Sequence, residues 1–143
     1  MDAIQLAFPE PGNPFFSPAF IVYSRAQAIA DGALVDVTEI GAEVGFKLPV
    51  AITEALHNRL TPKKTDEAIG QEYDGRLWDV LWQAAFTIKL ADPGTGTFSF
   101  TFALQEVDAK SGRPQTTDLR LRAVCSPGDE GEQIVTIGFP EDF

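Results

Sequence analysis

The stretch YDGRLWDVLWQAAFTIKL, from Tyr73 to Leu90, constrains the fold of this chain more than any other. Its apolar residues recur at the 3.6-residue period of an α-helix. They are Leu77, Trp78, Leu81, Trp82, Ala85 and Ile88. The opposite side of such a helix carries Arg76, Asp79, Gln83 and Thr87. Because aromatic side chains bring large apolar areas to a core, the pattern predicts a central helix with its tryptophans facing inward.

The second half of the chain shows the two-residue period of β-strands. Between 97 and 104, phenylalanine or leucine occupies every second position, and smaller residues lie between them. Two further runs at 117–125 and 133–139 follow, each after a loop rich in glycine and polar residues. Consecutive strands joined by such loops predict an antiparallel meander of three to four strands.

The first half of the chain predicts an extended arm and short helices. Four prolines exclude a helix over 1–18 and favour an extended proline-rich arm. Ser24 and Gln27 match a capping box at the start of a short helix. Thr38 is expected to cap a second helix over 39–44. Pro49 is expected to open a third, since proline favours the first turn.

Together these elements predict an α+β fold. The short N-terminal helices and the central helix would pack on the C-terminal meander. The chain has 143 residues, of which 44% are hydrophobic, enough for one domain with a real core. We therefore expect a single domain over 19–143, preceded by the arm over 1–18.

Charge and cysteine content restrict the partners and the compartment. The chain has 21 acids against 11 bases, for a net charge of −10, and such a surface repels nucleic acid and anionic membranes. Direct nucleic-acid binding and membrane binding are therefore not expected. Cys125 is the single cysteine, which excludes an internal disulfide and fits a reducing compartment. The first residues do not resemble a secretory signal, and no apolar run reaches bilayer-spanning length, so we expect a cytoplasmic protein.

Acidic residues gather in two segments that are candidates for a partner-binding face. They are Asp36, Glu39 and Glu43 in the first half and Asp129, Glu130 and Glu132 near the end. One interpretation is an acidic surface that serves solubility alone. The other is a face that contacts a basic protein partner, which is the functional hypothesis taken from the charge.

Residue types that support catalysis or metal binding are sparse. The chain has one histidine, His57, and one cysteine, whereas a structural zinc site needs four such ligands. No nucleophile elbow or phosphate-binding loop is present in a suitable context. These observations predict no metal and no cofactor and favour a non-catalytic protein. An enzyme with a site built on His57, Tyr73 and Asp74 stays open as an alternative.

Several segments match the pattern of a known family. They are YSRAQAI at 23–29, DG at 31–32, VDV at 35–37, GFK at 45–47, PVA at 49–51, GRLWDVLW at 75–82, and Cys125 with PGD at 127–129. With these segments the chain resembles a family of small acidic bacterial proteins encoded on plasmids, integrative elements and prophages. The resemblance covers most of the chain from Tyr23 onward. It implies an accessory protein of a mobile genetic element and brings no catalytic residues.

The resemblance and the charge together lead to three hypotheses. The first is an anti-defence protein, which would inhibit a basic nucleic-acid-handling protein of CRISPR or restriction machinery. The second is a structural or regulatory module that self-associates as a homo-oligomer through the phenylalanine-rich arm. The third is the enzyme with an unrecognised site.

Overall fold

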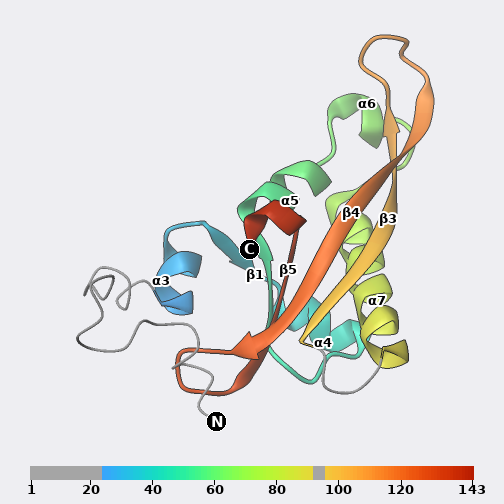
Figure 1. Cartoon of the computed structure of the whole chain (residues 1–143). Helices are drawn as coiled ribbons and strands as arrows, with labels where there is room; N and C mark the ends of the chain where they lie inside the picture. The colour runs from blue at the N-terminus through green and yellow to red at the C-terminus, as the bar shows by residue number, and fades with distance from the viewer. Residues whose placement is uncertain (1–23, 92–95) are drawn as a thin grey trace.

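The computed structural model describes residues 24–91 and 96–143 as an α+β fold built on one five-stranded sheet (Figure 1). The arm predicted over 1–18 lies outside the described residues. The strands are β1 (Leu34–Asp36), β2 (Val50–Thr53), β3 (Thr97–Val107), β4 (Pro114–Pro127) and β5 (Gln133–Gly138). The helices are α3 (Arg25–Ala30), α4 (Thr38–Val44), α5 (Glu54–Leu60), α6 (Lys64–Glu67), α7 (Tyr73–Leu90) and the 3₁₀ helix η1 (Pro140–Asp142).

The sheet is mixed, with the strand order β1-β2-β5-β4-β3. The three C-terminal strands pair antiparallel in succession, as the alternating runs predict. Strand β2 is parallel to β5, with Ile52 opposite Ile137, and β1 pairs antiparallel with β2. The predicted C-terminal antiparallel meander is therefore present as β3–β4–β5, but it forms part of a mixed sheet of five strands rather than a separate sheet of three to four.

Strand β2 accounts for most of this difference. All four of its residues are buried, and α5 begins only at Glu54, where the Thr53 hydroxyl accepts the Leu56 N–H. The prediction that Pro49 opens a helix is therefore wrong. A strand buried on both faces has no alternation, and a short apolar run cannot be told from a buried helix by periodicity.

The predicted helices in the first half are otherwise present. The Ser24 hydroxyl accepts the Gln27 N–H at the start of α3. Helix α4 begins at Thr38 itself, so the prediction that Thr38 is its cap is wrong. The Asp36 carboxylate accepts the Thr38 N–H at 3.0 Å instead.

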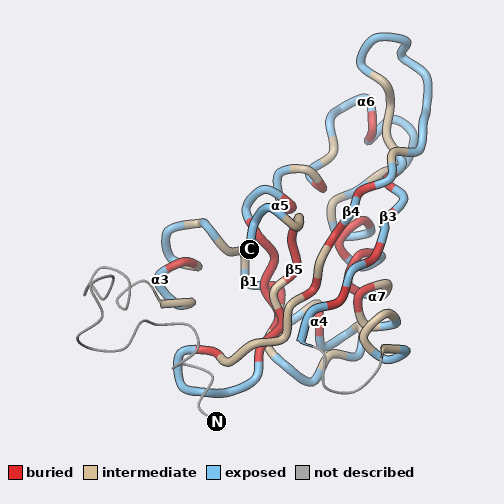
Figure 2. The backbone as a smooth tube through the Cα atoms, viewed as in Figure 1, coloured by how far each residue is buried: buried red, intermediate tan, exposed pale blue. Residues whose placement is uncertain are grey.

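The core lies between the sheet and α7. Every second residue of β3 is buried from Phe98 to Leu104, and the residues between them are exposed, as the alternation predicts. Figure 2 shows the buried positions concentrated in the central part of the sheet and on the facing sides of the helices, whereas the tip of the β3–β4 hairpin is exposed. The sheet thus gives α7 one apolar face to cover.

Helix α7 covers that face with a different side from the one predicted. Its buried residues are Arg76, Leu77, Val80, Leu81 and Ala84. Trp78 and Trp82 are exposed, so the prediction that the tryptophans face the core is wrong, as is the placement of Arg76 on the solvent side. Apolar residues occupy so much of the circumference of this helix that two stripes share the same helical spacing.

The contacts of Arg76 fix the rotation of α7. Its side chain is 3% exposed, and its guanidinium donates to the backbone oxygens of Leu60 at 3.1 Å and Gln105 at 2.7 Å. A carboxylate oxygen of Asp66 lies 3.5 Å away. A buried charge is tolerated when it is paired and hydrogen-bonded, so these partners hold Arg76 inward and leave the tryptophans outside.

Candidate functional site

Helix α7 presents a row of large apolar side chains to solvent, which we call the aromatic stripe. It consists of Trp78, Trp82 and Phe86, which are 39%, 49% and 48% exposed. Residues four apart lie on the same side of a helix, so the three rings form one continuous surface. The rings of Trp82 and Phe86 stack nearly parallel, with centroids 5.3 Å apart and 7° between their planes. Contiguous exposed apolar surface of this kind marks interaction sites in proteins.

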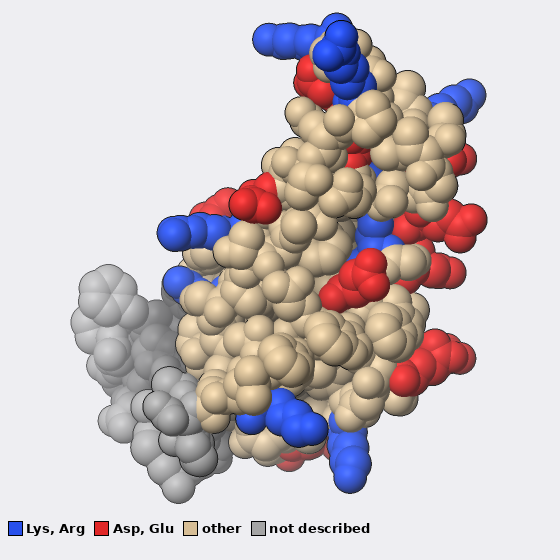
Figure 3. All heavy atoms as spheres, turned by 90° about the vertical axis from the view of Figure 1, so that its right-hand side faces the viewer, with Lys and Arg blue, Asp and Glu red and all other residues tan. Residues whose placement is uncertain are grey.

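A groove runs beside the stripe, between the segment that follows α4 and the C-terminal half of α7. We call it the α4–α7 groove; its volume is about 540 Å³. Its lining includes Phe46 and Leu48 from the segment after α4, Phe86 from α7 and Cys125 from β4. The lysines at 47 and 89 also line it. Figure 3 shows this side of the molecule as a broad uncharged area with most of the charged side chains at its margins.

A polar network lies between α5, α6, the start of α7 and β3. The Arg59 guanidinium donates to both carboxylate oxygens of Glu106, at 2.9 and 2.7 Å, and joins α5 to β3. These hydrogen bonds, with a smaller contribution from Thr117, outweigh burial and lower the pKa of Glu106 to about 2. Burial alone would raise the pKa of Asp66. The N–H groups of Lys63 and Val107, together with the Arg76 charge, hold it below its ordinary value.

The acidic residues of the first half lie at the start of α4 and on its exposed side. Burial would raise the pKa of Asp36, but the hydrogen bonds from Thr38 and the nearby Arg25 charge keep it below its ordinary value. Asp36 therefore has a local role as a helix-start acceptor. Glu39 and Glu43 are exposed, and helix α4 packs against α7.

The acidic residues near the end of the chain lie in the turn between β4 and β5. Asp129 accepts the N–H groups of Arg25 and Ala26 at 2.8 and 2.9 Å and so binds the start of α3. Glu132 accepts the N–H of Glu130 within the turn itself. All three acids are exposed, but the carboxylates of Asp129 and Glu132 already accept backbone N–H groups, which leaves Glu130 as the one without a hydrogen bond among the described residues.

The structure brings together two of the three residues named for an enzyme. The His57 Nδ1 lies 2.6 Å from the Tyr73 hydroxyl, and the two rings meet edge to face. Burial, and then the neighbouring Asp74 charge, raises the pKa of Tyr73. Asp74 is exposed on the first turn of α7. This pair lines neither the α4–α7 groove nor the cavity described next.

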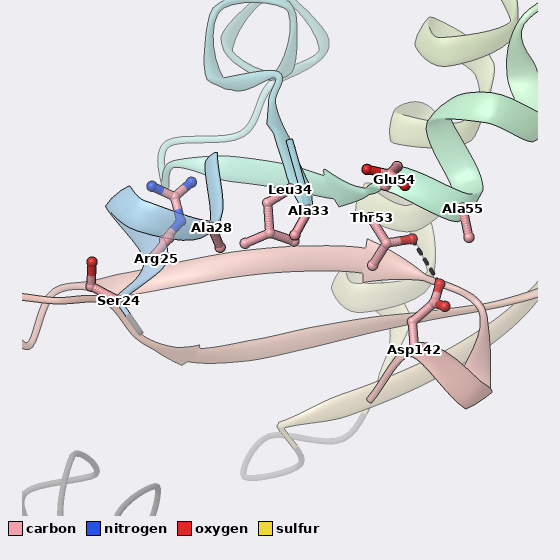
Figure 4. Close-up of a pocket in the computed structure, with 9 residues that line it drawn as sticks. All are labelled: Ser24, Arg25, Ala28, Ala33, Leu34, Thr53, Glu54, Ala55 and Asp142. Atoms are coloured by element: carbon pink, nitrogen blue, oxygen red, sulfur yellow. Dashed lines mark hydrogen bonds between the residues drawn. The ribbon is translucent and has the colours of Figure 1, made fainter. Parts of the chain in front are cut away.

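A second cavity, of about 490 Å³, lies between α3, the end of β2 and the C-terminus (Figure 4). Its polar lining is partly engaged already, because the Asp142 carboxylate accepts the Thr53 hydroxyl at 2.7 Å and the Phe139 N–H at 2.8 Å. At the opposite side, two guanidinium nitrogens of Arg25 are buried without a hydrogen-bond partner among the described residues. Through its hydrogen bond with Thr53, Asp142 holds the C-terminal 3₁₀ helix η1 against the end of β2.

Metal sites and membrane spans concern the described ranges 24–91 and 96–143. In those ranges, no group of three or more histidine, cysteine, aspartate or glutamate residues is arranged to hold a metal ion. None of the helices described there is long and apolar enough to cross a membrane. Cys125 is half-buried, and burial raises the pKa of its thiol.

The aromatic stripe and the groove are not predicted from the sequence, because the helical period of α7 fits two different sides of the helix. The sequence predicts that Trp78 and Trp82 face the core, because their spacing fits a buried stripe. The sequence does contain a signal of the exposed stripe. A second apolar line recurs at four-residue intervals and consists of Trp78, Trp82, Phe86 and Leu90. A helix with two apolar lines has more apolar surface than one sheet face can cover.

Comparison with known proteins gives one match. A family of unknown function, DUF6573, matches residues 13–143 of the chain. No curated protein and no solved structure matches the chain.

Proposed function

The chain belongs to a family of unknown function, and we propose from its surface that it is a non-catalytic protein-binding module. The aromatic stripe is the observation that carries the proposal. Tryptophan is enriched among the side chains that dominate binding energy at interfaces, and such anchors lie in the centre of the contact. Trp78, Trp82 and Phe86 supply three adjacent anchors on one rigid helix.

The exposed acidic side chains of α4 and α7 support a basic partner. Helix α4 packs against α7 and exposes Glu39 and Glu43, and α7 itself exposes Asp79. An apolar centre with a charged rim is the ordinary arrangement of a protein–protein interface. The partner we propose has an apolar pocket bordered by lysine and arginine.

The net charge of −10 and the resemblance to proteins of mobile elements support a narrower version of the proposal. In this version the partner is a basic nucleic-acid-handling protein of the host, and the chain acts as an anti-defence inhibitor of CRISPR or restriction machinery. The acidic residues of the chain would then contact the surface with which the partner binds nucleic acid. Long-range attraction between the negatively charged chain and its positively charged partner would speed association, and this attraction would weaken with salt.

Affinity capture from bacterial lysate at low and high salt, with matched variants, tests the proposal. We expect the wild-type chain to capture a basic protein, the Trp78→Ser/Trp82→Ser variant to lose about tenfold or more in affinity, and Glu39→Lys/Glu43→Lys to slow association. Glu67→Lys/Asp118→Lys reverses two exposed acids elsewhere and serves as the charge control. A partner that binds the tryptophan variant as tightly as the wild type would show that the stripe is not the interface.

A further inference from the structure

The α4–α7 groove has a chemistry that selects its occupant. The parallel rings of Trp82 and Phe86 stand at its α7 side, and Phe46 lies in its lining. Grooves lined by aromatic rings bind proline-rich segments, because such segments are already extended and lose little entropy on binding. Lys47 and Lys89 also line the groove, and neither forms an ion pair with another described residue. The groove therefore fits an extended segment that carries prolines, aromatic rings and carboxylates.

The N-terminal part of this chain has that composition. Residues 1–23 read MDAIQLAFPEPGNPFFSPAFIVY and lie outside the described residues. They include four prolines, two of which form the PxxP spacing at Pro11 and Pro14. Phe15 and Phe16 follow directly, and the two charged side chains of the segment, Asp2 and Glu10, are both acidic.

The described part of the chain begins close enough for this segment to reach the groove. Asp129 accepts the N–H groups of Arg25 and Ala26, which fixes the start of α3 at the turn after β4. Cys125, in the groove lining, precedes Asp129 by four residues, about 13 Å along an extended strand. The eight residue-to-residue steps from Phe16 to Ser24 span about 26 Å when extended, which covers this separation.

We propose that residues 9–16 occupy the α4–α7 groove of their own chain, with the prolines and phenylalanines against Trp82 and Phe86 and with Glu10 towards the lysines. The inference goes beyond the proposed function and does not depend on an external partner. Trp82 and Phe86 line the groove, so the docked segment covers two of the three rings of the aromatic stripe, and an external partner that uses them must first displace the segment. Trp78, Glu39 and Glu43 do not line the groove, so they stay open when the groove is filled.

The single native thiol of the chain makes the proposal testable by cross-linking. In the full chain, Pro14→Cys places a second thiol in the segment, while Cys125 lines the groove. Because burial raises the pKa of the Cys125 thiol, mild oxidation is carried out at alkaline pH. Ser111→Cys, at the exposed tip of the β3–β4 hairpin, is the matched control.

We expect Pro14→Cys to give a monomer with an internal disulfide between positions 14 and 125. Its yield should be about tenfold or more above the control, since docking raises the effective concentration of the two thiols. Mass spectrometry of the linked peptides identifies the bond. A yield equal to that of Ser111→Cys overturns the proposal. Linkage found only in covalent dimers overturns it as well and assigns the groove to the segment of a second copy.

Tryptophan fluorescence gives an independent readout, because both tryptophans of the chain lie on α7. Phe15→Ser/Phe16→Ser and Lys47→Glu/Lys89→Glu should each shift the emission to longer wavelength and increase quenching by acrylamide, as Trp82 loses its cover. Lys63→Glu/Lys64→Glu, which reverses two exposed lysines outside the groove, should change neither quantity. Emission and quenching that stay at wild-type values in the first two variants contradict docking.

Discussion

Glu106 shows how a single residue couples stability to pH. Its pKa is about 2 in the folded chain, against an ordinary value of 4.5, because Arg59 and Thr117 donate to its carboxylate. At pH values above the ordinary pKa of 4.5, the lowered pKa of Glu106 stabilises the fold by its full amount. That stabilisation is lost as the pH falls towards 2. Because Arg59 is 36% exposed, solvent screening reduces the effect to about 1–2 kcal/mol.

We therefore predict that Glu106→Gln lowers the free energy of unfolding at pH 7 by about 1–3 kcal/mol. It should also flatten the fall in stability between pH 5 and pH 2. Urea unfolding at a series of pH values measures both effects. The exposed Glu67→Gln should keep the wild-type pH profile, and a Glu106→Gln profile as steep as that of the wild type would show that the ion pair does not couple stability to pH.

Arg76 carries a second prediction at the same scale. Replacing it by methionine leaves the Leu60 and Gln105 oxygens without their donor and leaves Asp66 without its nearest cation. Breaking a buried pair on one side typically costs about 3–5 kcal/mol, so we expect Arg76→Met to lose that much in urea unfolding. Arg113→Met, on the exposed β3–β4 hairpin, should lose less than about 0.5 kcal/mol. Equal losses in the two variants would refute the anchoring role of Arg76.

At the scale of elements, α7 has two apolar sides with different consequences for stability. Leu81 is fully buried against the sheet, so Leu81→Ala should cost about 2–5 kcal/mol. Trp82 is half-exposed, and Trp82→Ala should cost about 1 kcal/mol or less, mostly from lost stacking on Phe86. Urea unfolding followed by far-UV circular dichroism compares the two without relying on tryptophan emission. A larger loss in Trp82→Ala would reverse the orientation described for the helix.

Elements with one buried and one exposed face could be predicted from the sequence, and the others could not. The alternation in β3 locates both the strand and its buried face, because period two has a single inward side. The period of α7 locates the helix but leaves two candidate sides, and the partners of Arg76 that decide between them are distant in the chain. Strand β2 has no exposed face and no period, so its assignment depends on its pairing with β5. The candidate site depends on which side of α7 faces solvent, and the distant contacts of Arg76 decide that.

At the scale of the whole molecule, the parallel β2–β5 pair joins the first half of the chain to the last strand. Val50, Ala51 and Ile52 pair with Val135, Thr136 and Ile137, so the sheet is complete only when both halves are in place. Non-local pairing of this kind makes separate folding of the halves unfavourable. The sequence predicts that residues 19–143 form one domain. The β2–β5 pairing leads us to expect that this domain unfolds as a single cooperative unit.

Ile52→Ala tests that statement. Ile52 is fully buried, and its truncation should lower the free energy of unfolding by about 2–5 kcal/mol. In a single cooperative unit, tryptophan emission, which reports on α7, and far-UV circular dichroism, which reports on all elements, should shift to the same new urea midpoint. Emission that keeps the wild-type midpoint while the dichroism shifts would show that α7 and β3–β4 unfold separately from the β1–β2–β5 region, and the chain would then contain two folding units.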